Sequence, residues 1–221
     1  IYKATTTFTI TQRSIADATV TFTDLTYNGS EQTTDITVKL GEKTLTKVVD
    51  YTVTGDLKGT NAGEYTVTVN GTGNYTGTKE ATFTIDKATP TADDFTFTAP
   101  ANLAYDGSPK AASVTTTNAE IGAVTVSYDP AVPTNAGKYK VKISTAETKN
   151  YKPVTDLTAD DWKFTIAPKP VTVTDIAAQD KTYDGTNTAK ITGTLTGVLE
   201  KDAANVTLNA PAATFASKDV N

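Results

Sequence analysis

Two ten-residue stretches, 60–69 and 134–143, repeat one motif in which apolar and polar positions alternate. The positions that keep their character are Tyr65/Tyr139, Val67/Val141 and Val69/Ile143. The positions that change are Glu64/Lys138, Thr66/Lys140 and Thr68/Lys142. Because alternate side chains of a strand face opposite sides of the sheet, the unchanged set predicts a face toward a core and the variable set a face toward water. This pattern indicates packing and does not indicate catalysis.

A second alternating stretch closes each repeat. The letters Phe-Thr-Ile occur at Phe8–Ile10, Phe83–Ile85 and Phe164–Ile166. The side chains expected to point inward are Ala81, Phe83 and Ile85 in one copy and Trp162, Phe164 and Ile166 in another. Thr, Val, Tyr and Phe recur throughout the chain, and no helix-period apolar stripe exceeds about two turns. The sequence therefore predicts an all-β protein.

A tyrosine followed by Asx-Gly sets the period of the repeats. Tyr27, Tyr105 and Tyr183 each precede such a pair, and successive tyrosines are 78 residues apart. Asx-Gly pairs suit tight turns because both residues tolerate positive φ. We expect each tyrosine to pack inward with its hydroxyl on a backbone partner. A repeat of this length predicts an array of equivalent modules.

The motifs divide the chain into four parts. Residues 1–11 are predicted to be the terminal strand of a preceding module, 12–88 one module and 89–168 a second. Residues 169–221 are predicted to be a third module that is incomplete at its C-terminus. The junctions between modules are short, and Pro168 and Pro170 are expected to stiffen the second one. The chain is expected to be part of a longer array.

Composition narrows the chemistry. The 221 residues contain no Cys, no His and no Met, which removes disulfides, thiolates, imidazole bases and the usual zinc, copper and haem ligands. The net charge of −5, with both signs interspersed, argues against nucleic acid or anionic lipid as a partner. No apolar run approaches membrane-spanning length, and residues 1–10 do not resemble a signal peptide.

The repeated motif resembles part of the immunoglobulin fold. Asn61-Ala62-Gly63-Glu64-Tyr65-Thr66-Val67 and its copy at 135–141 resemble the turn into strand F, where the tyrosine forms a corner with the backbone. Val67 and Val141 stand in place of the disulfide cysteine, and no tryptophan marks strand C. The resemblance implies β-sandwiches of the looser, bacterial Ig-like kind.

The combined motifs resemble the bacterial surface repeats called MBG, and the start of the third unit resembles the related YDG repeats. The resemblance rests on the Tyr-Asx-Gly and Asn-Ala-Gly-x-Tyr motifs, on Asn74-Tyr75 and Asn150-Tyr151, and on Phe-Thr-Ile. It implies elongated tandem Ig-like modules in large secreted or wall-attached bacterial proteins, often adhesin-like, and therefore an extracellular location. It supplies no catalytic residue to transfer.

Several side chains are candidates for a functional role. Asp93-Asp94 and Asp160-Asp161 are clustered carboxylates that suit calcium between modules, but no calcium-loop pattern accompanies them and we favour solvated acids. Trp162, Tyr75 and Tyr151 are aromatics of the kind that stack on sugars. Trp162 shares strand parity with Phe164, so we favour core packing for it.

Covalent chemistry has little support in the sequence. A Lys–Asn isopeptide crosslink needs a buried Lys, an Asn and an acid together, whereas Lys138, Lys140 and Lys142 fall on outward positions. Ser30 and Ser108 belong to turns, and a serine triad is unavailable without His. Asn70 and Asn74 match the N-glycosylation pattern but coincide with turns. A glycosidase pair of carboxylates would need a deep cleft, which small sandwiches seldom enclose.

We therefore predict no catalytic, metal-binding or cofactor-binding residue, and a non-catalytic spacer region of a bacterial surface or secreted adhesin-like protein. Its expected partners are neighbouring modules of the same chain. The alternative is an adhesive segment in which one module binds a glycan or a host protein, with residues 152–161 as the candidate loop. We also expect Thr5–Ile10 to add as a strand to a neighbouring molecule.

Overall fold

The computed structural model describes residues 3, 5–210 and 212–219, and these residues form an almost entirely β-stranded fold, as predicted. The chain divides into two compact units. Unit 1 comprises residues 1–95, 116–125 and 144–157, and unit 2 comprises residues 96–115, 126–143 and 158–221. Residues of the predicted module 89–168 thus belong to both units.

Unit 1 is built on two sheets. Its elements are β1 (Arg13–Ser14), β2 (Thr19–Phe22), β3 (Leu25–Thr26), β4 (Gln32–Thr33), β5 (Ile36–Leu40), β6 (Lys43–Thr44), β7 (Tyr51–Thr54), β8 (Lys58–Gly59), β9 (Gly63–Gly71), β10 (Tyr75–Thr76), β11 (Thr78–Asp86), the 3-10 helix η1 (Ala92–Asp94) and β16 (Val154–Leu157). One sheet has the order β3-β11-β9-β7 and the other the order β2-β5-β6. Two further pairs, β1-β10 and β4-β8, border them.

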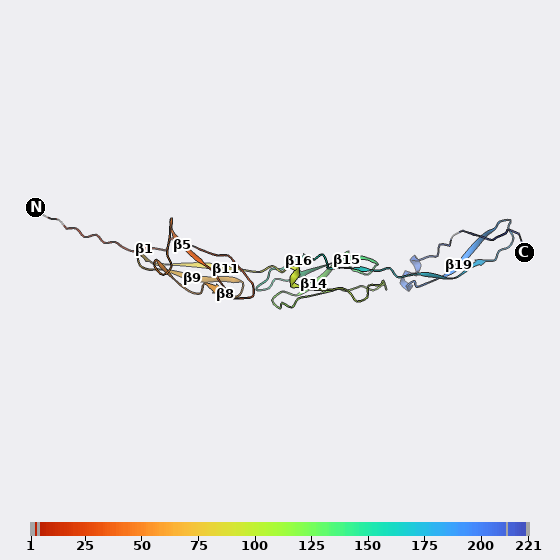
Figure 1. Ribbon diagram of the computed structural model, residues 1–221, viewed down its shortest axis with the longest axis horizontal. Helices are drawn as coiled ribbons and strands as arrows, with labels where there is room; N and C mark the ends of the chain where they lie inside the picture. Colours follow the sequence, from red (N-terminus) through yellow and green to blue (C-terminus); the bar gives the residue numbers. More distant parts are fainter. Residues whose placement is uncertain (1–2, 4, 211, 220–221) are drawn as a thin grey trace. The chain divides into compact units, whose positions relative to one another are not determined.

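The long strands β9 and β11 run antiparallel, side by side, at the centre of the first sheet (Figure 1). Phe83 lies opposite Tyr65 in this register. Val67, Val69, Phe83 and Ile85 are buried, whereas the intervening Thr66, Thr82 and Thr84 are exposed, as the alternation predicts. Apolar side chains of the second sheet meet this face: the Phe22 and Phe83 rings lie 5.6 Å apart, and Val38 and Leu40 share a core with Val69. Unit 1 therefore contains a β-sandwich.

The remaining elements are β12 (Thr96–Thr98), β13 (Ser113–Thr115), β14 (Val124–Asp129), β15 (Gly137–Thr145), β17 (Lys163–Ile166), β18 (Thr172–Gln179), β19 (Thr188–Thr196), the 3-10 helix η2 (Glu200–Asn205) and β20 (Ala213–Thr214). In unit 2, β15 pairs antiparallel with β17, so that Tyr139 lies opposite Phe164. Tyr139, Val141, Phe164 and Ile166 are buried, which confirms the inward face predicted from the second copy of the motif.

The C-terminal part of unit 2 is a three-stranded sheet of order β18-β19-β20 (Figure 1). Every residue of β18 is exposed, including Val173 and Ile176. The β18–β19 register shifts between Thr174 and Ala177, where Asp175 adopts a φ of 53°. This sheet buries much less apolar surface than the sandwich of unit 1.

At the other end of the chain, Thr5–Ile10 form no strand, and Phe8 and Ile10 are 88% and 97% exposed. The predicted strand at 1–11 includes residues 1, 2 and 4, which lie outside the described residues. Within the described part of the chain, no helix has the length and apolar character needed to cross a bilayer.

Candidate functional site

Each Asn-Ala-Gly turn is held by the tyrosine that follows it. The Tyr65 hydroxyl donates to the Asn61 carbonyl oxygen at 2.7 Å, and the Tyr139 hydroxyl donates to the Asn135 carbonyl oxygen at 2.9 Å. Tyr65 also stacks on Phe83, with ring centroids 5.1 Å apart. These are the tyrosine corners that the immunoglobulin resemblance implies. They fix a turn at the start of β9 and of β15.

The first turn lies against a residue from the next repeat, within unit 1. The Asn150 side chain is 1% exposed, and its Oδ1 accepts a hydrogen bond from the backbone N–H of Ala62 at 2.9 Å. Its Nδ2 donates to Asn61 Oδ1 at 3.1 Å and to Glu120 Oε2 at 2.9 Å. The buried amide is thus satisfied by three groups from two distant segments. We call this set (Asn61, Ala62, Glu120 and Asn150) the Asn150 latch.

Aromatic and ionic contacts surround the Asn150 latch. The Tyr27 and Tyr151 rings meet edge to face, with centroids 5.5 Å apart, and the Tyr151 hydroxyl accepts from Asn118 Nδ2 at 2.8 Å. Lys87 Nζ donates to Glu147 Oε1 and to the Thr148 carbonyl oxygen, both at 2.7 Å. The first Tyr-Asx-Gly motif and the Asn-Tyr motif therefore meet, although they lie more than 100 residues apart in sequence.

The second Tyr-Asx-Gly motif makes a different joint, within unit 2. The Tyr105 hydroxyl donates to Asp202 Oδ2 at 2.8 Å, and this hydrogen bond raises the pKa of Tyr105 above its usual range. Lys201 Nζ donates to the Gly107 carbonyl oxygen at 2.7 Å and lies 5.5 Å from the Tyr105 ring centroid. Beside them is a groove of about 350 Å³, lined by Asn135, Ala136, Pro168, Val171, Leu199 and Val206 among others. Turns of one repeat again face residues of the next.

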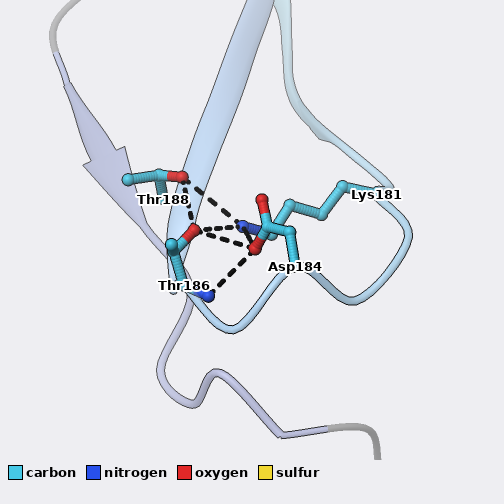
Figure 2. Close-up of polar contacts among 4 residues, drawn as sticks. All are labelled: Lys181, Asp184, Thr186 and Thr188. Carbon is cyan, nitrogen blue, oxygen red and sulfur yellow. Dashed lines mark hydrogen bonds and ion pairs between the residues drawn. The ribbon is translucent and has the colours of Figure 1, made fainter.

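The third Tyr-Asx-Gly motif carries a polar cluster of Lys181, Asp184, Thr186 and Thr188 (Figure 2). Asp184 Oδ1 accepts from Lys181 Nζ, from the Thr186 backbone N–H and from the Thr186 hydroxyl, each at 2.9 Å. These donors, the lysine foremost, lower the pKa of Asp184 to about 2. Tyr183 is 58% exposed and lines an open groove of about 620 Å³ together with Lys181, Phe215 and Lys218.

These three motifs correct one prediction. We expected every Tyr-Asx-Gly tyrosine to bury its hydroxyl on a backbone group, but Tyr105 donates to a carboxylate and Tyr183 is exposed. Tyr105 differs because its hydroxyl meets Asp202 of the following repeat, a contact that the local sequence does not reveal. For the contact between Tyr27 and Tyr151, the sequence did contain a signal: the Asn150-Tyr151 motif has a copy at Asn74-Tyr75.

The other candidate residues lie in a helix cap, on the surface or in the core. Asp94 Oδ2 accepts from the Thr91 backbone N–H at 2.7 Å and so caps η1. Asp160 and Asp161 are exposed, and no group of three or more acidic side chains suited to a metal occurs among the described residues. Trp162 is buried, which confirms core packing. Tyr75 is buried too, and its hydroxyl meets Lys43 Nζ at 2.7 Å.

The remaining loop and turn candidates also have hydrogen-bond partners or strand positions. Within the candidate adhesive loop 152–161, residues 154–157 form β16, and the Thr158 hydroxyl donates to the Val141 carbonyl oxygen at 2.8 Å. The backbone N–H groups of Ser30 and Ser108 donate to Asn28 Oδ1 and Asp106 Oδ1, both at 2.9 Å, which confirms that these serines belong to turns. Asn70, which was expected in a turn, lies instead in β9, and its Nδ2 donates to Thr54 Oγ1 at 2.9 Å.

One lysine was missed by the sequence analysis. Lys110 is 7% exposed and pairs with Asp106, which also accepts from Asn102 Nδ2 at 3.3 Å. The hydrogen bond from Lys110 lowers the pKa of Asp106, which favours the charged carboxylate. All three residues lie on the turn that carries Tyr105, where the ion pair braces the loop between Asn102 and Lys110.

Three segments of the chain match models of known domain families. Residues 18–89 and 98–160 match the model of the MBG domain, and residues 167–221 match that of the YDG domain. The two MBG segments together cover more than half of the 221 residues. No curated protein and no solved structure matches the chain. The chain belongs to the MBG domain family.

Proposed function

We propose that this chain is a non-catalytic spacer region of a bacterial cell-surface or secreted adhesin-like protein. The observation that carries the proposal is the Asn150 latch. A fully satisfied amide buried between two repeats gives their contact a defined geometry, since moving either repeat would leave polar groups unpaired.

The distribution of side-chain roles supports the same function. The residues common to the repeats hold turns and cores: Tyr65 and Tyr139 close corners, and Tyr27 and Tyr105 contact the next repeat. A spacer needs such joints, whereas an enzyme needs reactive groups gathered in a cleft. Each repeat that brings its own core and joint adds a unit to the array.

The experiment is a binding screen of the whole chain. The folded protein is applied to a glycan array and to extracellular matrix and cell-surface protein preparations, and its backbone dynamics are measured by ¹⁵N relaxation. A spacer is expected to bind none of these ligands specifically. It is also expected to show the residues on both sides of the Asn150 latch tumbling together.

The adhesive alternative has its own outcome in this screen. Saturable binding that is lost on substitution of exposed residues in one repeat would replace the spacer proposal with an adhesive one. The control is a matched substitution at the equivalent exposed position of the other repeat. For example, a substitution at Lys140 is compared with one at Thr66.

A further inference from the structure

The backbone that enters the first repeat has the same arrangement as the backbone that enters the second. The Arg13 N–H donates to the Asn74 carbonyl oxygen at 3.0 Å, and the Ala88 N–H donates to the Asn150 carbonyl oxygen at 3.0 Å. Arg13 pairs in parallel with Tyr75, and Ala88 pairs in parallel with Tyr151. Asn74 therefore occupies the position that corresponds to Asn150.

The side chains just before these bonds correspond as well. Gln12 Nε2 donates to the carbonyl oxygen of Gly73, one residue before Asn74, at 2.8 Å, and Lys87 Nζ donates to that of Thr148, two residues before Asn150, at 2.7 Å. The two asparagines nevertheless differ in surroundings. Asn150 is buried in its latch, whereas Asn74 is exposed, and its side-chain amide has no hydrogen-bond partner among residues 3, 5–210 and 212–219.

A second observation points to the same place. Phe8 and Ile10 precede Arg13 by the same spacings at which Phe83 and Ile85 precede Ala88. Phe83 and Ile85 are buried in register with Tyr65 and Gly63 of β9, next to the Asn-Ala-Gly turn that reaches Asn150. Phe8 and Ile10, by contrast, lie almost fully in solvent.

Unit 2 shows that this strand register is general. Phe164 pairs with Tyr139 and Ile166 with Gly137, on the strand that follows the second Asn-Ala-Gly turn. In both repeats in which the Phe-Thr-Ile segment is buried, it therefore pairs with the strand that follows an Asn-Ala-Gly turn. Such a strand along Thr5–Ile10 would also bring its turn to Asn74.

We propose that Thr5–Ser14 and Asn74 form the docking surface for an MBG module joined in series ahead of them, in which Thr5–Ile10 serve as the last strand. The Asn-Ala-Gly-x-Tyr strand of that module pairs with Phe8 and Ile10, and its turn binds the Asn74 amide as Asn61 and Ala62 bind Asn150. The inference rests on the proposed spacer role and names the partner of this surface. Backbone pairing supplies the affinity, and the asparagine amide selects the turn.

The test lengthens the whole chain by one repeat. A second copy of residues 12–77, which contains β9 but not β11, is fused directly ahead of Lys3. By the spacing above, Lys3 then follows Gly77 of the copy as Thr78 does in the chain itself. The proposal expects the copy to fold, with amide exchange at Phe8 and Ile10 slowed at least about tenfold relative to the parent chain. The Asn74 side-chain amide protons should become protected as well.

Two variants make this outcome specific. Phe8→Asp with Ile10→Asp should unfold the 12–77 copy while unit 1 of the parent chain stays folded. A matched control carries a copy of residues 12–86, which has its own β11, and this copy should fold with or without the two substitutions.

Three results would overturn the inference. The first is a 12–77 copy that stays unfolded, or that folds equally well with both aspartates. The second is a folded copy beside an Asn74 amide that exchanges as fast as in the parent. The third is self-association of the parent chain through Phe8 and Ile10 in sedimentation velocity, which would make another molecule the occupant. None of these bears on ligand binding, so failure here is distinguishable from failure of the spacer proposal.

Discussion

Asn150 and Ala62 are joined by a 2.9 Å hydrogen bond across 88 positions of sequence. The acceptor is a side chain that is almost completely buried, and the donor is the backbone of a turn that a tyrosine corner already holds in place. A flexible surface contact would leave both groups free to hydrate. The bond therefore holds the Asn-Ala-Gly turn of the first repeat against Asn150 within unit 1.

The first prediction concerns this bond. Asn150→Ala removes the acceptor of the Ala62 N–H and the donor to Glu120, and leaving buried polar groups unpaired costs about 1–3 kcal/mol. We expect amide exchange at Ala62 to accelerate and the first unit to unfold at lower denaturant concentration. Asn74→Ala is the matched control, because Asn74 is exposed, and its effect should stay within about 0.5 kcal/mol. Equal effects of the two substitutions would contradict the latch.

The second prediction compares two equivalent tyrosines. Tyr105→Phe removes the hydroxyl that donates to Asp202, so it should lower the stability of unit 2 and free the Lys201–Asp202 segment. Tyr183→Phe removes an exposed hydroxyl and should change nothing. The measurement is amide exchange of η2 in each variant. Unchanged exchange in Tyr105→Phe would show that this hydrogen bond does not hold η2 in place.

The third prediction concerns the close approach of Gly59 to the tyrosine corner. A Cβ added at Gly59 would overlap the Tyr65 ring, which cannot move away because it stacks on Phe83 and bonds the Asn61 carbonyl. Overpacking of this kind costs about 1–3 kcal/mol, so Gly59→Ala should lower the unfolding free energy by that amount.

The control for Gly59 is a double variant, measured by chemical denaturation. In a Tyr65→Leu background the ring is gone, and Gly59→Ala should then cost much less than in the parent chain. Additive costs in the double variant would show that the ring is not the cause.

The fourth prediction concerns pH. The pKa of Asp184 is lowered to about 2, chiefly by Lys181, relative to 3.8 in an unstructured chain. The charged carboxylate is thus favoured by folding: its stabilisation is present above pH 3.8 and is lost as the pH falls toward 2. In a ¹³C titration, Lys181→Met should move the Asp184 midpoint up toward 3.8. Lys218→Met, which removes the partner of Asp219, should leave it in place. An Asp184 midpoint that stays near 2 in Lys181→Met would contradict the assigned cause.

The sequence was most informative where burial follows a period. Alternation in 64–69 and 138–143 predicted the buried faces of β9 and β15, since a slip of one residue would have exposed Val67 and Val141. The same reasoning placed Trp162 in the core. It does not account for β18, where Val173 and Ile176 are apolar yet exposed because few elements cover this strand.

The joints could not be predicted from periodicity. Glu120 and Asn118 meet Asn150 and Tyr151 from a segment about 30 residues away, and Asp202 meets Tyr105 from 97 residues away. Such contacts depend on how segments distant in sequence come together, within a repeat or between repeats, which no local pattern encodes. Lys110 was missed for a related reason, since its burial depends on the fold of the turn around Asp106.

The first two Tyr-Asx-Gly turns have a further property that matters for a chain under tension. The Tyr27 N–H donates to the Asp86 carbonyl oxygen at 2.8 Å, and the Tyr105 N–H donates to that of Ala167 at 2.9 Å. In both cases the early segment runs parallel to the closing strand of its repeat. Pulling on the two ends of a repeat therefore loads these bonds in shear, all at once, and cannot peel them apart one by one.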